Sequence, residues 1–322
     1  MTTNPTQPSR PFRRRLANVI LAPLVMLTLG ALFAPVHWIA DVLSSGRPQQ
    51  VIALLAAALV CLAMKQFWHA GASLACAALH LLLVSGQLLP PLRDERSRDS
   101  SIRLMTVNVL TSNKRYQTVI DEIRQLDPDV FALLEINGEW KRVSREAFKD
   151  DYPNVLAIHD DFGNFGIALF SKSAFSSEDT FQLNEQIDSL EVVTSGVRLI
   201  ATHPLPPLGQ HHFHSRNRHL AEIAKRVTSR RTANPDQPIA VLGDLNVTPW
   251  SPNFTRFESE SGLKRARVGL ELRPTWHLAG SSFLTGLALD HVLASDHFWC
   301  EHYDVGPDVG SDHRGVCVTL KY

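Results

Sequence analysis

The sequence predicts an α/β or α+β domain preceded by an N-terminal transmembrane segment. The first observation is an uneven distribution of charge. Between residues 16 and 92 only 3 of 77 residues are Asp, Glu, Lys or Arg, whereas 61 of the other 245 are charged. The charged fraction of these other 245 residues, about a quarter, is usual for soluble proteins. The second observation is that helical and strand-length apolar patterns mix after residue 101, with both hairpin-length and helix-length connections.

Composition excludes several classes of protein. The 322 residues include 32 basic and 32 acidic side chains, and residues 93–322 carry a net charge of −5. This balance argues against a strongly basic nucleic-acid binder. A hydrophobic share of 44% excludes extensive disorder, and four cysteines are too few for a disulfide-built scaffold.

Three apolar runs predict about three transmembrane helices within residues 16–92: Leu16–Ala40, Val51–Met64 and Ala70–Leu92. A span needs about 20 apolar residues, so the second run is short and would use flanking residues at the interface. A cleavable signal peptide is the alternative for the first run, since three arginines precede it. Two further apolar runs favour an uncleaved anchor.

The basic residues predict the orientation of this segment. Residues 1–15 contain four arginines and are expected in the cytoplasm. Three spans would then place the residues after Leu92 outside, so we predict a multi-pass inner (plasma) membrane protein with a periplasmic or extracellular domain. Two spans would reverse this orientation. Residues 93–101 read as a linker, and 102–322 as the globular domain.

Within the globular domain, helices are predicted over Tyr116–Leu126 and about Arg216–Thr228, where apolar residues recur at helical spacing. An Asp-Pro-Asp turn follows the first helix. The predicted strands, in order, are Ile102–Val109, Val130–Leu134, Val155–His159, Ile167–Phe170, Glu191–Val193, Val197–Ala201, Ile239–Leu242, Leu289–Leu293, Phe298–His302 and Val316–Leu320.

Polar residues stand where these apolar strands begin or end. They are Asn108, Glu135, His203, Asp244 with Asn246, Asp290 with His291, and Asp312 with His313. Any one of them could be a turn residue that bonds its own backbone. Six such ends together are more than turn chemistry predicts. Because strand ends at one edge of a sheet converge, we expect these side chains to share one site.

The residue types predict the chemistry of that site. Carboxylate and amide oxygens suit Mg²⁺ or Mn²⁺, whereas zinc would call for several His or Cys ligands. An Asp–His pair provides proton transfer and an oriented imidazole. A divalent ion combined with such pairs is what hydrolysis of a phosphoester requires.

The ordered series from Asn108 to the Ser-Asp-His motif at residues 311–313 resembles the endonuclease/exonuclease/phosphatase family. The similarity covers about residues 102–322, and GDLN at 243–246 and GSDH at 310–313 make it specific. It implies a four-layer sandwich of two packed mixed β-sheets with helices outside. The membrane segment followed by GDLNVTPWS is similar to a bacterial membrane-anchored branch of that family.

The resemblance also implies roles for individual residues. Glu135 resembles the main metal ligand, helped by Asn108 and by Asp312. Asp244 would position or deprotonate the attacking water, and Asn246 would hold that water or the phosphate.

The histidines complete the implied set. His313 would contact the scissile phosphate with its ring oriented by Asp290. His203 would stabilise the developing charge or assist the leaving group.

Several residues outside the motifs have a predicted role together with a structural alternative. Arg216 and Trp276 are predicted to bind substrate, with a solvated helix surface and packing at the rim or in the core as the respective alternatives. His211, His212 and His214 are expected in an exposed loop. Cys300 and Cys317 flank the terminal strands, and an extracytoplasmic location would permit a bond between them.

Together these features predict a membrane-anchored, Mg²⁺- or Mn²⁺-dependent phosphodiesterase. Its substrate would be a nucleic acid or a phospholipid head group, and the sequence gives no basis for inferring a protein partner. The alternative is a catalytically inactive, membrane-tethered binding module of the same fold.

Overall fold

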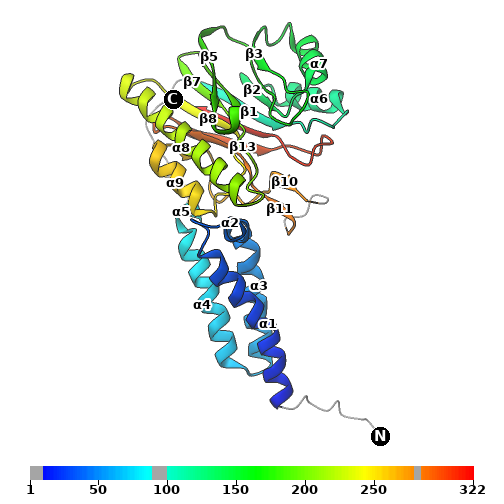
Figure 1. Cartoon of the computed structure of the whole chain (residues 1–322), viewed down its shortest axis with the longest axis vertical. Coiled ribbons are helices and arrows are strands. Elements are labelled where there is room, and N and C mark those ends of the chain that lie inside the picture. The colour runs from blue at the N-terminus through cyan, green and yellow to red at the C-terminus, as the bar shows by residue number, and fades with distance from the viewer. Residues whose placement is uncertain (1–9, 89–99, 279–283) are drawn as a thin grey trace. The chain divides into compact units, whose positions relative to one another are not determined.

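The computed structural model describes residues 10–88, 100–278 and 284–322, which form two compact units. The first unit contains the N-terminal helices together with residues 250–252. The second unit contains nearly all the remaining residues and every strand (Figure 1). The predicted linker, except for its last two residues, lies outside the described residues.

The first unit is helical. Its helices are α1 (Arg10–Ala31), α2 (Trp38–Ser45), α3 (Arg47–Ala63), α4 (Phe67–Leu83) and the single turn α5 (Ser85–Leu88). The predicted first span extends to Ala40, but α1 ends at Ala31 and a turn follows. Pro35 lies in this turn, and its ring cannot supply the backbone N–H that a continuing helix needs.

Two polar contacts show the relative direction of α1 and α4. The His69 ring Nε2 lies 2.8 Å from Asn18 Oδ1, and the His80 ring Nε2 lies 3.1 Å from Thr28 Oγ1. The earlier residue of α4 meets the earlier residue of α1, so the two helices are parallel. Both histidines therefore connect helices within this unit.

Only α1, among the described residues, is both long and apolar enough to cross a membrane unaided. The pair α2 and α3, bent by 66°, would count as a second span if it acts as one. Helix α4 has 17 residues, below the roughly 20 that a span needs. The predicted set of three spans is therefore not established. Residues 89–92 of the predicted transmembrane segment, and residues 1–9 of the predicted cytoplasmic N-terminus, lie outside the described residues.

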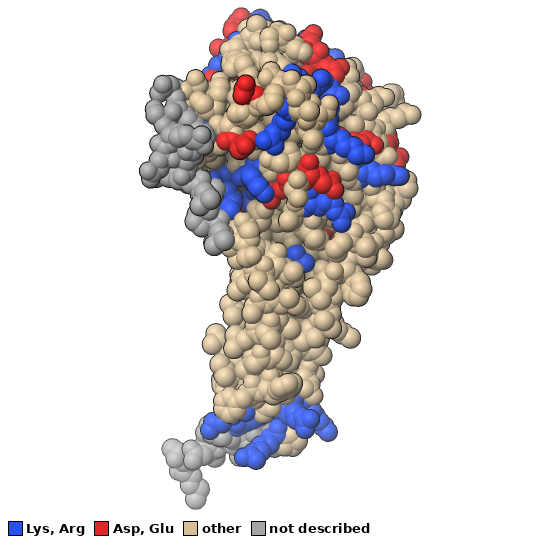
Figure 2. All heavy atoms as spheres, turned by 90° about the vertical axis from the view of Figure 1, so that its left-hand side faces the viewer, with Lys and Arg blue, Asp and Glu red and all other residues tan. Residues whose placement is uncertain are grey.

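The exposed apolar side chains of this unit are consistent with apolar surroundings. Val19, Met26, Leu59 and Leu82 each expose two thirds or more of their side chains, which is unusual for a water-soluble surface. Figure 2 shows lysine and arginine side chains gathered where α1 begins, and the arginines of the N-terminal prediction lie in this first part of α1.

The second unit contains two six-stranded sheets and one two-stranded ribbon of β10 (Trp276–His277) and β11 (Gly286–Leu287). The first sheet has the order β13 (Trp299–Val305), β14 (Val316–Lys321), β1 (Ser101–Asn108), β2 (Val130–Leu134), β4 (Ile167–Ser171) and β3 (Asn154–Ile158). The second has the order β5 (Phe175–Leu183), β6 (Ile187–Thr194), β7 (Val197–Ala201), β8 (Ile239–Asp244), β12 (Asp290–Ala294) and β9 (Lys264–Arg265).

The sheets stack face to face between two layers of helices. One apolar core joins both sheets and includes Leu104 of β1 and Leu199 of β7. A second core packs α6 (Tyr116–Leu126) and α7 (Gly138–Phe148) on the first sheet, and a third packs α8 (Gln210–Ala233) and α9 (Pro252–Ser261) on the second. Figure 1 shows the two helix pairs on opposite sides of the strands. The predicted four-layer sandwich of mixed sheets is confirmed.

Three predicted elements begin and end at the same residues in the structure: the helix Tyr116–Leu126 and the strands Val130–Leu134 and Val197–Ala201. The other predicted strands are present with ends shifted by a few residues. The prediction missed α7, α9 and β5. Strand β5 is an edge strand with a mostly exposed, polar sequence, so it lacks the apolar alternation by which a strand is recognised.

Glu122 of α6 is a buried carboxyl outside the strand-end cluster. Its side chain is 5% exposed, and neither carboxyl oxygen has a hydrogen-bond partner among the described residues. Two glycines leave room for it: a Cβ at Gly306 would lie 1.7 Å from Glu122 Oε1, and one at Gly315 would lie 3.1 Å away. Burial raises the pKa of Glu122 to about 7, although the charge of Arg314 acts in the opposite direction.

We expect Glu122→Gln to make the protein less sensitive to rising pH. Between pH of about 4.5 and 7, the unfolded chain releases the Glu122 proton while the folded chain keeps it, so the free energy of unfolding falls as pH rises, by roughly 3 kcal/mol. Glutamine does not titrate and avoids this loss. Urea unfolding at pH 5 and pH 8 measures the effect, with the exposed neighbour Asp121→Asn as control. An equal stability difference between variant and wild type at both pH values would contradict it.

Candidate active site

The strand ends of both sheets meet at one cluster of polar side chains. Asn108 is the last residue of β1, and Glu135 directly follows the parallel neighbour β2. In the second sheet, Asp244 ends β8 and is paired in register with Asp290, which begins β12. The Asn108 amide joins the two sheets, because its Nδ2 donates to Glu135 Oε1 at 2.8 Å and to Asp244 Oδ2 at 3.3 Å.

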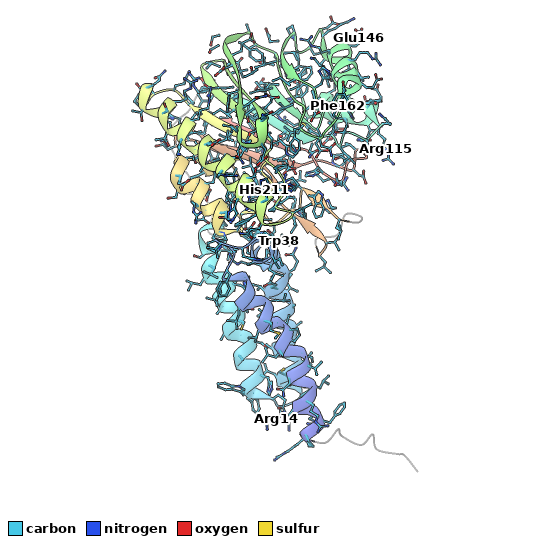
Figure 3. All side chains as sticks on the ribbon, viewed as in Figure 1. Arg14, Trp38, Arg115, Glu146, Phe162 and His211 are labelled. Carbon is cyan, nitrogen blue, oxygen red and sulfur yellow. The ribbon has the colours of Figure 1, made fainter. Side chains whose placement is uncertain are left out.

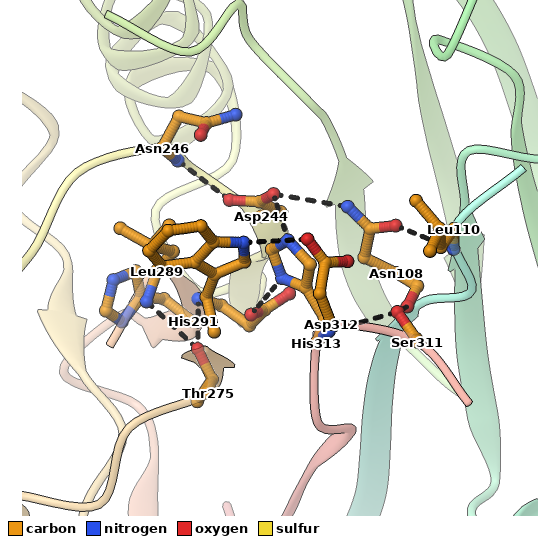
Figure 4. A network of polar contacts seen from close by, with 12 residues as sticks. Asn108, Leu110, Asp244, Asn246, Thr275, Leu289, His291, Ser311, Asp312 and His313 are labelled. Carbon is orange, nitrogen blue, oxygen red and sulfur yellow. Dashed lines mark hydrogen bonds and ion pairs between the residues drawn. The ribbon is translucent and has the colours of Figure 1, made fainter. Parts of the chain in front are cut away.

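One carboxylate oxygen lies between two imidazoles. Asp244 Oδ2 is 3.6 Å from His203 Nδ1 and also 3.6 Å from His313 Nε2. The far nitrogen of His203, Nε2, lies 3.6 Å from Glu135 Oε1. His203, Asp244 and His313 are all nearly completely buried. Glu135, His203, Asp244, His313 and Asp290 thus form one connected set, and Figure 4 shows Asp244 and His313 within it. His291 lies outside this set, because its ring is bonded to the Val247 carbonyl.

The loop that carries His313 is fixed on several sides. His313 Nδ1 donates to Asp290 Oδ2 at 2.8 Å. The His313 backbone N–H donates to Ser311 Oγ at 3.0 Å, and that hydroxyl donates to the Asn108 carbonyl at 2.8 Å. These bonds keep a proton on Nδ1 and fix the direction of the ring, leaving Nε2 facing Asp244.

Burial and charge shift the pKa values of this cluster in a consistent pattern. Burial alone would lower the pKa of His313, but Asp290 and Asp244 raise it to about 10. Burial raises the pKa of Asp244 to about 6, with Asp290 adding to the effect and the two imidazoles opposing it. Burial would also raise the pKa of Glu135, yet the His203 ring and the Asn108 amide bring it below its ordinary value. The arrangement therefore favours an ionised Glu135 and a protonated His313.

The backbone at the site adopts left-handed conformations that few residues take. Glu135 has φ +60° and Asn246 has φ +51°, which costs about 1–3 kcal/mol for a non-glycine residue. Gly243 has φ +150°, and a Cβ there would lie 1.9 Å from the Thr202 carbonyl oxygen. These turns direct the Glu135 side chain and place β8 close against the His203 segment.

Comparison with family models identifies residues 105–313 as a match to the endonuclease/exonuclease/phosphatase family. This range covers more than half of the chain and includes every residue of the cluster. The chain belongs to the endonuclease/exonuclease/phosphatase family. Its predicted resemblance is thereby confirmed. A search of curated proteins finds no match.

Solved structures of the endonuclease/exonuclease/phosphatase fold resemble this chain at low sequence identity. A family member from Beutenbergia cavernae DSM 12333 is 20% identical, with a TM-score of 0.55 over 70% of this chain and 72% of that one. Sphingomyelinase C from Streptomyces griseocarneus is 15% identical, with a TM-score of 0.54 over 68% and 99%. TDP2 from D. rerio, complexed with single-stranded DNA product, is 16% identical, with a TM-score of 0.58 over 70% and 100%.

The donor groups of the site fit the divalent cation that the family implies. Glu135 Oε2 is buried without a hydrogen-bond partner among the described residues, while its other oxygen accepts from Asn108. An ionised carboxylate with one free oxygen is suited to a hard cation such as Mg²⁺. A second group of possible ligand atoms, from Asp244, Asp290 and His313, lies within 4.8 Å of one another. A protonated His313 already bonded to Asp290 is a poor metal ligand, so Glu135 offers the better cation position.

Asp312 and Trp276 are joined to each other. The Asp312 side chain is exposed, and its Oδ2 accepts from the Trp276 indole Nε1 at 2.9 Å. Trp276 also forms a backbone bridge with His313. Trp276 therefore lies beside the site, where its half-buried ring orients the Asp312 carboxylate.

Arg216 does not match its predicted role. Its side chain is completely buried, and NH1 donates to the Asn246 carbonyl oxygen at 2.6 Å. A guanidinium with no exposed surface is not placed to contact a substrate. The alternative of a solvated helix surface is excluded by the same burial, so Arg216 supports the turn after Asp244.

One further expectation differs from the structure, which also describes the two cysteines whose bonding the sequence left open. His211, His212 and His214 lie on the first turns of α8 and not in a loop; Figure 3 labels His211 there. Cys300 and Cys317 are both free. The register of β13 and β14 pairs Cys300 with Leu320 and Cys317 with Asp304, so the two cysteines are not opposite one another.

Sequence reasoning missed the supporting residue Thr275, which precedes Trp276 in a segment without a strand pattern. Its buried hydroxyl accepts from the backbone N–H groups of Leu289 and Asp290, at 2.9 and 3.0 Å. Its carbonyl accepts from the N–H of Arg314 at 2.6 Å. Thr275 thus connects the strand that begins at Asp290 to the loop that carries His313 (Figure 4).

Proposed function

We propose that the protein is a membrane-anchored, Mg²⁺- or Mn²⁺-dependent phosphodiesterase. The observation that carries the proposal is the position of Asp244, whose one carboxylate oxygen lies 3.6 Å from the ring nitrogens of both His203 and His313. A base placed between two imidazoles, beside an ionised carboxylate that fits a cation, suits the attack of water on a phosphoester.

Three side chains of the cluster have separate roles in this proposed hydrolysis. Asp244, with its raised pKa, orients the water and accepts its proton. His313, protonated and held by Asp290, donates to a non-bridging oxygen of the phosphate and offsets the charge that develops there. His203, between Asp244 and Glu135, stabilises the charge that develops at the leaving group.

The cation would be held by Glu135, with Asn108 and Asp312 as the further candidates. When bound, it neutralises phosphate charge and acts as a Lewis acid. The Asn108 amide now donates to Glu135, so in this arrangement it fixes the carboxylate. Asn246 uses its side-chain Nδ2 on the Pro204 carbonyl at 2.9 Å, which leaves its Oδ1 as the group that would hold water.

The substrate is a nucleic acid or a phospholipid head group. The net charge of −5 over residues 93–322 disfavours a dedicated duplex-DNA enzyme, because duplex binding depends on many Lys and Arg contacts to phosphates. Membrane anchoring favours a lipid or another small phosphoester. Among the solved structures that resemble this fold, TDP2 is complexed with a single-stranded DNA product and sphingomyelinase C is named for a phospholipid, so both substrate classes are represented.

A hydrolysis panel tests the function and separates these classes. The detergent-solubilised full chain is assayed with and without Mg²⁺ or Mn²⁺ on plasmid DNA, RNA, sphingomyelin, phosphatidylinositol phosphates and a generic phosphodiester. We expect metal-dependent turnover of at least one substrate that is lost with EDTA. No turnover of any substrate, with either metal, would leave the inactive binding module as the better description.

We propose that the catalytic domain lies in the periplasm or outside the cell. The parallel course of α1 and α4, with α3 between them in sequence, supports an odd number of crossings after an arginine-rich cytoplasmic start. Alkaline phosphatase fused after Leu92 should therefore be active. An inactive fusion there, with activity from a cytoplasm-specific reporter at the same site, would reverse the topology.

A further inference from the structure

Two buried side chains of α8 contact the two segments that carry His203 and Asp244. Arg216 and His219 are three residues apart, so they lie on one face of the helix. Their exposed fractions are 0% and 1%. Burying such polar groups is costly unless they form hydrogen bonds, so their partners indicate what they do.

Arg216 holds the turn that follows Asp244. Its NH1 donates to the Asn246 carbonyl oxygen at 2.6 Å, and its Nε donates to Asn217 Oδ1 at 2.9 Å. Asn246 has φ +51°, and its N–H donates to Asp244 Oδ1 at 2.9 Å. A charged donor on the Asn246 carbonyl stabilises this left-handed turn, and the turn in turn orients the Asp244 carboxylate.

His219 holds the residue that precedes His203. Its Nε2 lies 2.6 Å from Thr202 Oγ1, and that hydroxyl lies 2.8 Å from Ser189 Oγ. Burial lowers the pKa of His219 to about 3, so the ring is neutral and has one N–H. The other ring nitrogen, Nδ1, has no partner among the described residues. A buried N–H without an acceptor would be costly, so the proton belongs on Nε2 and is donated to Thr202.

The two segments held by α8 are also bonded to each other. Asn246 Nδ2 donates to the Pro204 carbonyl at 2.9 Å, and His203 Nδ1 donates to the Asp244 carbonyl at 3.1 Å. Residues 202–204, which include His203, are therefore hydrogen-bonded to residues 244–246, which include Asp244. Helix α8 contacts both of these segments, through His219 and Arg216 respectively.

We propose that Arg216 and His219 are positioning residues that fix His203 and Asp244 in their reactive arrangement without contacting substrate. This inference rests on the proposed hydrolytic function for its kinetic part only. The variants Arg216→Met and His219→Leu remove the two hydrogen bonds, whereas Arg216→Lys and His219→Gln each retain a polar group. Arg226→Gln is the matched control, because Arg226 lies on the same helix and pairs with Asp179 and Glu191, away from the cluster.

Hydrogen exchange of the full-length protein in detergent tests the positioning directly. In Arg216→Met, the amide protons of residues 244–247 should exchange about tenfold faster or more, and in His219→Leu those of 202–203 should do so, since each variant loses a strong hydrogen bond. Arg226→Gln should leave both segments unchanged. Unchanged exchange in Arg216→Met and His219→Leu, or equal acceleration in the control, would overturn the proposal.

Kinetics on the phosphodiester found by the panel then test the consequence. We expect kcat to fall about 10- to 100-fold in Arg216→Met and His219→Leu, the usual range for a lost supporting contact, with KM nearly unchanged. The Lys and Gln variants should recover part of the loss. A rise in KM at constant kcat would instead show contact with the substrate and overturn the positioning role. If the wild type hydrolyses nothing, the proposed function fails while the exchange experiment still decides the role of α8.

Discussion

Glu135→Gln should reduce kcat/KM for a phosphodiester by about a thousandfold or more. The change keeps the size of the side chain but removes the charge that would hold a divalent ion, and such an ion contributes several kcal/mol of transition-state stabilisation. Glutamine can still accept from Asn108, as Glu135 Oε1 does at 2.8 Å. We therefore expect loss of activity without loss of fold.

Three measurements separate the metal effect from other causes. Mg²⁺ binding, followed by calorimetry, should weaken strongly in Glu135→Gln, while circular dichroism stays unchanged. Glu139→Gln is the matched control, since Glu139 is an exposed residue of α7 paired with Arg142. Wild-type activity of Glu135→Gln at saturating Mg²⁺ would remove Glu135 from the site.

Much of the site could be predicted because its residues end buried strands. Apolar runs fix the strands, and neighbouring strands of one sheet bring their ends together, so Asn108 with Glu135, and Asp244 with Asp290, could be grouped from the sequence. Their contact across the two sheets could not, because it depends on how the sheets stack. The left-handed turn at Glu135 was also beyond prediction, since glutamate rarely adopts this conformation.

The supporting residues were harder to predict for a related reason. Arg216 and His219 look like any polar residues of an amphipathic helix, and only the packing of α8 on the second sheet shows that they face inward. The start of α8 is missed because residues 210–215 contain one apolar side chain, Phe213, and so carry no helical period. Burial in the folded state, which a local pattern does not encode, decides the role of these residues.

The second large effect concerns the partnership of Asp290 and His313. Their 2.8 Å bond indicates that Asp290 acts only through the His313 ring, whereas Asp244 lies at the other ring nitrogen and acts on water. Asp290→Asn should therefore lower kcat/KM by roughly 100- to 10,000-fold, as expected when an imidazole loses the carboxylate that orients it. Adding His313→Ala should cost little more, because both changes disable one unit.

Two double-mutant cycles on kcat/KM, with one phosphodiester at saturating Mg²⁺, distinguish this partnership from independent roles. Asp244→Asn combined with His313→Ala should cost more than either change alone, since the two residues perform different steps. Asp296→Asn, at an exposed position beyond β12, controls for loss of a carboxylate near this strand and should leave activity unchanged. If the losses from Asp290→Asn and His313→Ala are additive, Asp290 does not act through the ring, and its effect must come from stabilising the start of β12, where it is paired with Asp244.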